Sequence, residues 1–116
     1  MKVYLAGPMR GIPHFNFPAF MSAAVKLRED GHVVFNPAER DERKYGPEFF
    51  SWNETGDMRL AVHNHGFSLR EALRSDLQWI CQEADAIALL PGWSESRGAV
   101  AEHAVAHALD LEVIYL

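Results

Sequence analysis

Asp85-Ala86-Ile87-Ala88-Leu89-Leu90 is a short apolar run, and Gly98-Ala99-Val100-Ala101-Glu102 follows it after a polar loop. The first stretch is typical of a buried strand, and the second of the first turns of a helix. In a parallel α/β domain the carboxyl ends of the strands form the ligand crevice. The pattern therefore predicts an α/β fold in which Glu102 lies beside a binding site.

The length and composition are those of one globular domain. The chain has 116 residues, of which 48% are hydrophobic and 23% charged, and this is enough for one hydrophobic core. No apolar stretch approaches the ~20 residues of a membrane span, and the first apolar run is too short for a signal peptide. We predict a single domain over residues 1–116 that binds no membrane.

Charge and cysteine content indicate which ligands and which cellular environment suit the protein. The formal net charge of −5 argues against binding along a nucleic-acid backbone, although local cations can still hold a small anion. The single cysteine, Cys81, has no partner for an internal disulfide. This fits a reducing environment, so we predict a cytoplasmic protein.

Strands and helices alternate along most of the chain. Apolar runs predict strands at about residues 2–6, 32–35, 85–90 and 113–115. Helices are expected from the candidate N-cap Asn16 to Gly31, from the Ser68–Glu71 capping box to about residue 84, and over 98–110. Right-handed crossovers then give a flavodoxin-like three-layer sandwich with a short, mainly parallel sheet in the order 2-1-3-4.

Residues 38–67 interrupt this alternation. They show no apolar period, and their charges are scattered among aromatic side chains. A loop of this length in a small domain is usually functional or partly disordered. We predict a lid-like insertion here, with a helical turn near residues 47–52.

Asp76 lies within the apolar stripe of the predicted helix 69–84. It follows Leu73 by three residues and precedes Ile80 by four, and Leu69 and Ala84 complete the stripe. A carboxylate buried on such a face acquires a partner or a raised pKa. Asp76 is therefore either a functional carboxyl or a side chain that caps a neighbouring loop.

Glu102 shares a side of its helix with Val105 and Leu109 and borders the alanine-rich face. It is either catalytic or an acidic residue that favours the positive end of the helix dipole. Two carboxylates near one crevice suggest glycosyl chemistry, in which one attacks a sugar carbon and the other donates a proton. The pair also suits a divalent metal, but no further acidic cluster completes its oxygen ligands. We expect neither a metal nor another cofactor.

Two loops predicted at the same sheet edge suit an anion. The first, Gly7-Pro8-Met9-Arg10-Gly11, offers backbone N–H groups and an arginine to a phosphate. The second contains Ser94, Ser96 and Gly98 and can donate hydrogen bonds to the same anion. Each loop is also compatible with an ordinary strand-to-helix turn.

The histidines and the loop aromatics have plainer interpretations. His63 and His65 lie in the predicted lid, while His103 and His107 are one helical turn apart, a spacing that can bind zinc. Because His103 and His107 share a face with Asp110, we expect solvated surface there rather than a zinc site. Some of the loop aromatics should form the core of the lid, and one or two can stack on a flat heterocycle: Phe15, Phe49, Phe50, Trp52 and Trp93.

Four segments carry a family resemblance: Val3–Gly11, Ser75–Ile80, Ala84–Ile87 and Ser96–Glu102. In this order they resemble the nucleoside 2-deoxyribosyltransferase superfamily. The nearest likeness is to the 2'-deoxynucleoside 5'-phosphate N-hydrolases and to a related uncharacterised phage and bacterial family. The chain departs from these hydrolases at Pro8, where they tend to have a small polar residue.

The resemblance implies a flavodoxin-like fold and cleavage of an N-glycosidic bond. It implies that Glu102 attacks the anomeric carbon, that Asp76 donates a proton to the departing base and that Tyr4 orients the nucleophile. It further implies that a 5'-phosphate is held by Arg10 and Ser96, in loops that also contain Gly7, Gly11 and Gly98. The implied partners are a small nucleotide or nucleoside and a second copy of the chain, in a homodimer or larger homo-oligomer.

We therefore expect an N-glycosidase acting on a nucleoside 5'-monophosphate, or a deoxyribosyltransferase that passes the sugar to another base. The alternative is a binding or sensor module that keeps the nucleotide pocket without turnover. The joint presence of Tyr4, Asp76 and Glu102 favours the enzyme, because a pure binder has less need of that trio. A zinc-dependent hydrolase is the third hypothesis.

Overall fold

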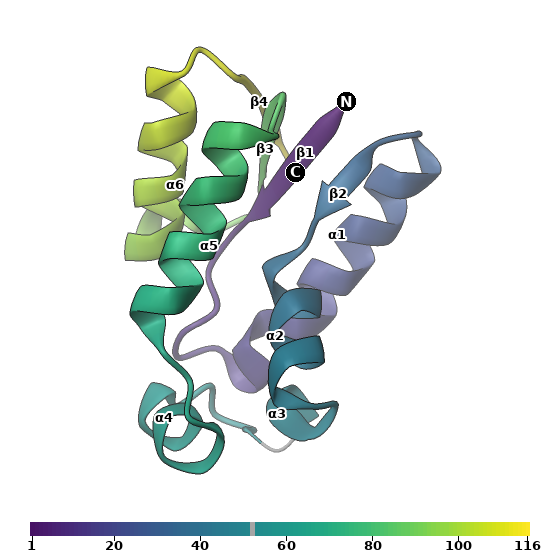
Figure 1. Cartoon of the computed structure of the whole chain (residues 1–116). Helices are drawn as coiled ribbons and strands as arrows, with labels where there is room; N and C mark the ends of the chain where they lie inside the picture. The colour runs from purple at the N-terminus through teal and green to yellow at the C-terminus, as the bar shows by residue number, and fades with distance from the viewer. Residues whose placement is uncertain (52) are drawn as a thin grey trace.

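A parallel sheet forms the centre of the molecule, in a computed structural model that describes residues 1–51 and 53–116 (Figure 1). Its strands lie in the order β2-β1-β3-β4, with β1 at Lys2–Ala6, β2 at Val33–Phe35, β3 at Ala86–Leu89 and β4 at Glu112–Tyr115. Every pairing between these described strands is parallel. The predicted strand order is confirmed, and the sheet is parallel throughout.

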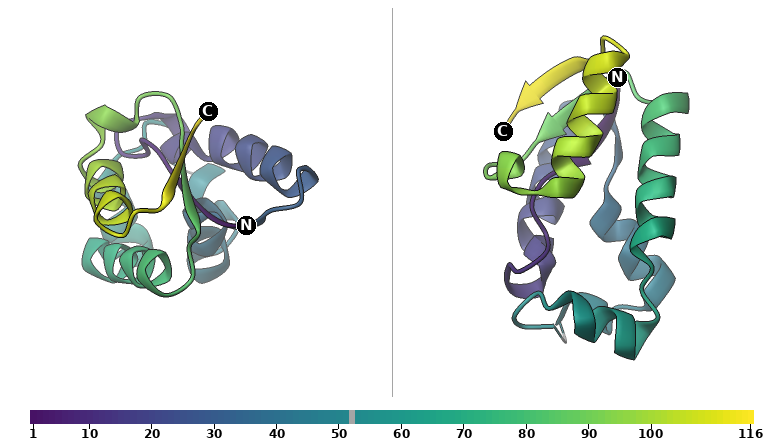
Figure 2. Two further views of the ribbon diagram at one scale, coloured as in Figure 1. Left: turned by 90° about the horizontal axis from the view of Figure 1, so that it is seen from above. Right: turned by 90° about the vertical axis from the view of Figure 1, so that its left-hand side faces the viewer.

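Helices cover both faces of the sheet, as expected for central strands that are apolar without alternation. Val3 and Leu5 of β1 pack toward α1 (Phe17–Glu29). Tyr4 and Ala6 point to the opposite face, toward α5 (Leu69–Gln82) and α6 (Arg97–Ala108). Figures 1 and 2 show the resulting three layers, which are those of a flavodoxin-like fold.

The start of α1 differs from the prediction. Asn16 precedes the helix, but its φ of 61° is left-handed and its side chain makes no capping hydrogen bond. Its Nδ2 donates instead to the carbonyl oxygen of Pro8 at 3.0 Å, so Asn16 binds the loop after β1 rather than the helix. The end of α1 agrees with the prediction, since Gly31 adopts a φ of +94° just after Glu29.

The α5 helix begins at the predicted cap. The Oγ of Ser68 accepts a hydrogen bond from the backbone N–H of Glu71 at 3.2 Å, and the helix ends at Gln82, two residues before the predicted end. Ile80 is buried as predicted, but Leu69 is 48% exposed. Leu69 lines the cavity described below and does not pack into the core.

The predicted lid contains three helices in its described part: α2 (Pro37–Tyr45), α3 (Glu48–Ser51) and α4 (Met58–His65). They lie at the end of the molecule where the strands end, and Figure 2 shows α4 crossing that end. The helical turn near residues 47–52 is confirmed as α3, and Trp52 lies outside the described residues. The expectation of a loop is otherwise wrong for most of this segment.

A highly charged sequence hides α2 from a search for apolar periodicity. Only a narrow stripe of it is buried: Pro37, Ala38 and Asp41. The helix is specified at its start, where Asn36 Oδ1 accepts a hydrogen bond from the N–H of Ala38 at 2.9 Å and Pro37 occupies the first turn.

The segment from α2 to α4 packs against the rest of the domain. Phe49 and Phe50 of α3 are buried, as predicted for the core of the lid, and so is Phe15, which precedes α1. Phe50 stacks on Phe17 of α1, with ring centroids 4.5 Å apart. The N–H of Gly11 donates to the carbonyl oxygen of Gly56 at 2.9 Å, and a Cβ on Gly56 would lie 2.1 Å from a backbone oxygen. Glycine is therefore required for this contact.

None of the helices in residues 1–51 and 53–116 is long and apolar enough to cross a bilayer.

Candidate functional site

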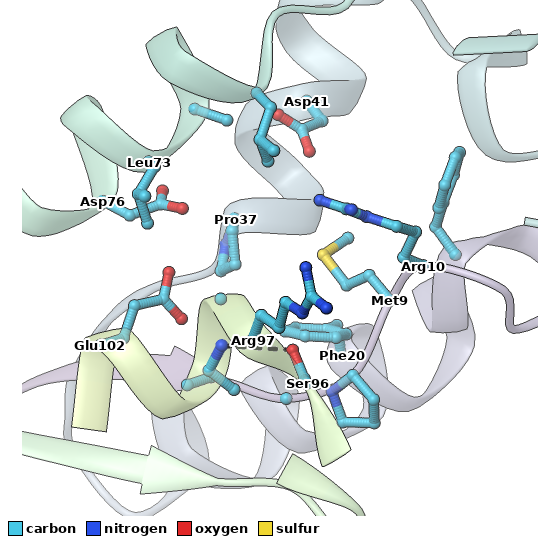
Figure 3. Close-up of a pocket in the computed structure, with 18 of the residues that line it drawn as sticks. Met9, Arg10, Phe20, Pro37, Asp41, Leu73, Asp76, Ser96, Arg97 and Glu102 are labelled. Carbon is cyan, nitrogen blue, oxygen red and sulfur yellow. Dashed lines mark hydrogen bonds between the residues drawn. The ribbon is translucent and has the colours of Figure 1, made fainter. Parts of the chain in front are cut away.

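A cavity of about 340 Å³ opens at the carboxyl ends of the strands (Figure 3). Its walls come from the loop after β1, from α2, from the first half of α5 and from the start of α6. This volume lies within the range of small-molecule sites. The cavity thus occupies the crevice in which a parallel α/β sheet binds its ligand.

Most of the predicted site residues line this cavity: Tyr4, Gly7, Arg10, Asp76, Ser96, Gly98 and Glu102. Gly11 and Ser94 lie outside the lining, and the N–H of Gly11 is used by its bond to Gly56. Position 7 requires glycine for a steric reason, because a Cβ there would lie 2.7 Å from the Cβ of Leu90. The structure therefore assembles the two carboxyls and both predicted loops at one place.

Glu102, Asp76 and Tyr4 form the buried end of the cavity. Glu102 is 6% and Asp76 7% exposed, and Tyr4 is fully buried. The hydroxyl of Tyr4 donates to Glu102 Oε2 at 2.7 Å. In Figure 3 the two carboxyls face one another from α6 and α5. Glu102 reaches this position because it shares the buried face of α6 with two small residues, Ala99 and Ala106.

The two carboxyls perturb one another. Burial raises the pKa of Glu102 well above the ordinary range, and the charge of Asp76 raises it further. Burial also raises the pKa of Asp76, but the Arg40 guanidinium opposes that rise. The two carboxyls therefore titrate as a coupled pair, in which burial favours the neutral form of each and Arg40 favours the ionised form of Asp76.

Tyr4 remains a hydrogen-bond donor at neutral pH. Burial, followed by the negative charge of Glu102, raises the pKa of its hydroxyl well above the ordinary value. The phenol therefore stays protonated and keeps Glu102 Oε2 in place.

Arg40 of α2 is the partner that the buried Asp76 requires. Its Nη1 donates to Asp76 Oδ1 at 2.5 Å, and its Nε donates to Asp41 Oδ1 at 2.9 Å. Asp41 is itself only 4% exposed, and burial raises its pKa to about 6 although Arg40 opposes the rise. One half-buried cation thus contacts two carboxylates directly and lies near a third, that of Glu102.

Arg40 and Asp41 were missed by the sequence analysis because they fall in the segment interpreted as a loop. The available signal was Asn36 followed by Pro37, a cap and a first-turn proline, with an acidic residue, Glu39, two positions later. A helix that starts there places residues 40 and 41 one turn inside it, at the edge of the sheet.

Arg10 and Arg97 form the opposite, cationic end of the cavity. Their guanidinium groups point into it in Figure 3, and both residues are exposed. No salt bridge found among the described residues includes either one. Ser96 caps α6, because its Oγ accepts a hydrogen bond from the N–H of Ala99 at 3.2 Å. Arg97 at the N-terminus of α6 and Arg10 in the loop after β1 favour an anionic ligand.

Arg97 was also missed by the sequence analysis, although it stands between two residues that were named, Ser96 and Gly98. The rest of the lining is mainly apolar, and it also includes the acidic residues Asp41 and Glu95. Its apolar members are Met9, Phe20, Pro37, Met58, Phe67, Leu69 and Leu73. The cavity therefore combines buried carboxyls, apolar side chains and exposed arginines.

The histidines lie away from the cavity lining. His107 and Asp110 are exposed as predicted, but His103 is half-buried and its ring lies 4.7 Å from that of Trp93. Within residues 1–51 and 53–116, no three histidine, cysteine, aspartate or glutamate side chains group closely enough to hold a metal ion.

Residues 1–115 match the family model of a domain of unknown function, DUF4406. The chain belongs to this family. No curated protein and no solved structure matches the chain. The family match spans every element that lines the cavity, from β1 to α6. In this chain the cavity therefore lies within the matched residues.

Proposed function

We propose that this DUF4406 domain cleaves the N-glycosidic bond of a nucleoside 5'-monophosphate, with Glu102 as the nucleophile. The observation that carries the proposal is a single cavity with two buried carboxyls and a tyrosine hydroxyl at one end and two arginines at the other. The resemblance of residues 3–11, 75–80 and 96–102 to nucleoside 2-deoxyribosyltransferases supports the same reaction.

The acidic end supplies the two groups that the bond cleavage needs. Ionised Glu102 forms a bond from its oxygen to the anomeric carbon, while the electrons of the C–N bond leave with the base. The base takes its proton from Asp76. Because Tyr4 occupies Oε2 of Glu102, Oε1 is the oxygen left for attack.

A single proton on the carboxyl pair gives both groups their required form. Burial raises the pKa of both groups, so a proton on the pair is retained more readily than it would be in water. In the reactive form this proton is on Asp76, which leaves Glu102 ionised as the nucleophile. Water, or a second base, then gives a proton to the Asp76 carboxylate and attacks the anomeric carbon, and the bond from that carbon to Glu102 breaks and releases Glu102 as a carboxylate.

The rest of the cavity suits the rest of a nucleotide. Arg10, Arg97 and the N-terminus of α6 offer positive charge and hydrogen-bond donors to a 5'-phosphate. Apolar side chains such as Pro37, Phe67 and Leu73 offer a surface for the base.

A nucleotide panel tests the proposal directly. The protein is incubated with ribo- and deoxyribonucleoside 5'-monophosphates and with the matching nucleosides, and free base is measured by chromatography beside the Glu102→Gln variant. Release of base from at least one monophosphate, lost in the variant, is the expected result. Binding of nucleotide without release of base from any member of the panel would favour the non-catalytic binding or sensor module.

A further inference from the structure

We propose that Arg40 is a positioning residue for this reaction. It orients Asp76 toward the substrate and stabilises the carboxylate that Asp76 becomes when it gives its proton to the departing base. The chemical part of this inference rests on the proposed function. Its electrostatic part rests only on the contacts of Arg40 in the ligand-free protein.

The geometry supports a fixed orientation for Asp76. Arg40 reaches from α2 to α5, where its Nη1 bonds Asp76 Oδ1 and also donates to the carbonyl oxygen of Ala72 at 3.4 Å. Its guanidinium lies 5.8 Å from the centroid of the Phe35 ring, and its side chain is only 16% exposed. With Oδ1 held, Oδ2 of Asp76 is the oxygen left for Glu102 and the ligand.

The charge balance gives this contact a chemical consequence. Burial makes Asp76 a weak acid, and a carboxylate left without a counter-ion in the cavity would be costly. Arg40 opposes the effect of burial, so it makes the proton of Asp76 easier to donate. The other ionisable groups that act on Asp76 are Tyr4 of β1 and Glu102 of α6, while Asp41 of α2 competes for the same guanidinium.

A purely structural role makes a different prediction. If Arg40 only ties α2 to α5, its loss should reduce the amount of folded protein and affect all substrates equally. If Arg40 also stabilises ionised Asp76, its loss should matter most for bases that need a proton in order to leave. It should also raise the pKa values of Asp76 and Glu102, both of which Arg40 lowers, so both limbs of the pH–rate profile should move to higher pH.

The experiment compares Arg40→Gln and Arg40→Lys with the wild-type protein. Each is assayed from pH 5 to 9, a range of ~4 units around neutrality, on an ordinary deoxynucleoside 5'-monophosphate and on its 7-methylguanine counterpart. The 7-methylguanine base leaves without accepting a proton. In parallel, the carboxyl groups of Asp76 and Glu102 are titrated by ¹³C NMR in the ligand-free proteins. Arg43→Gln, an exposed change on the same helix, is the matched control.

The expected result for Arg40→Gln is a loss of ~10- to 100-fold on the ordinary nucleotide and less than ~3-fold on the 7-methylguanine nucleotide. Both pH limbs and the Asp76 titration should move to higher pH, and Arg40→Lys should restore part of each change. Arg40→Gln leaves two buried carboxyls, those of Asp76 and Asp41, without their cation. The double variant Arg40→Gln/Asp41→Asn removes one of these charges and is measured beside the single variant, so that a loss of folding in the single variant does not decide the result.

Equal losses on both nucleotides with unmoved pH limbs would overturn the inference and leave Arg40 a structural anchor. An unchanged Asp76 titration would overturn it whether or not any base is released. A shifted titration in a protein that releases no base from any nucleotide would support the electrostatic role of Arg40 and contradict the proposed function instead.

Discussion

The two ends of the cavity use charge in different ways. At the acidic end, Asp76 and Glu102 are less than a tenth exposed and are held by Arg40 and Tyr4. At the basic end, the arginines are exposed and take part in no salt bridge found in the described part of the chain. Charges buried away from water interact strongly, whereas exposed charges are screened by water and salt.

This difference indicates a division of labour. The buried end can hold and move a proton because its groups perturb one another's pKa values. The exposed end can attract and orient an anion, but each of its charges contributes little alone. Single changes at the buried end should therefore alter the chemistry by orders of magnitude, and changes at the exposed end should alter binding modestly.

The largest effect is expected from Glu102→Gln. The amide keeps the shape of the side chain but is a poor nucleophile, so base release should fall by ~10³-fold or more while nucleotide binding is retained. Single-turnover kinetics and titration calorimetry measure the two quantities. Turnover within ~10-fold of the wild type would remove Glu102 from the mechanism.

Asp76→Asn should separate chemistry from stability. Loss of the proton donor should slow base release by ~10²- to 10³-fold, and by less for bases that are already good leaving groups. Arg40 keeps its bond to Asp41 in this variant, so the melting temperature should change by only a few degrees. Melting curves and turnover on the same preparation decide the matter, and activity lost only in proportion to unfolding would make Asp76 structural.

The stability of the buried end should depend on pH through Asp41. Its pKa of about 6 in the folded protein exceeds the ordinary 3.8, so the native state binds this proton more tightly than the unfolded chain. The resulting stabilisation is fully present below pH ~4 and is lost as the pH rises to ~6, by roughly 3 kcal/mol in all. Asp76 and Glu102 act in the same direction, since their pKa values are also raised.

Urea unfolding of the wild type and Asp41→Asn across pH 4 to 7, a span of ~3 units, measures this contribution. The free energy of unfolding of the wild type, relative to the variant, should decrease as the pH rises through this range. A difference that stays constant with pH would show that Asp41 titrates normally in the folded protein.

The smallest effects are expected at the basic end. Arg10→Ala and Arg97→Ala should each weaken binding of a nucleoside 5'-monophosphate by ~3- to 10-fold and leave binding of the nucleoside nearly unchanged. Added salt should reduce the difference between wild type and variants, because exposed charges are screened. Dissociation constants at low and high salt provide the measurement, and equal losses for both ligands would make the arginines structural.

Features that are specified by residues close together in the chain could be predicted from the sequence. The strand β3 and the start of α5 follow from an apolar run and a capping box, both of which are local signals. The burial of Asp76 follows from its position on an apolar stripe. The helix α2 could not be found in this way, because its sequence is dominated by charges and its buried face is narrow.

The sequence by itself determined that a buried carboxylate would lie at the ligand edge of a parallel sheet and would acquire a partner or a raised pKa, because burial and strand order follow from local periodicity. Only the tertiary structure decided that the partner is Arg40, which lies 36 residues before Asp76 and on another helix. It also decided that Arg97 faces the cavity while Gly11 does not. Such contacts depend on how separate helices and loops pack against one another. The apolar periodicity within one segment does not specify its distance from another segment.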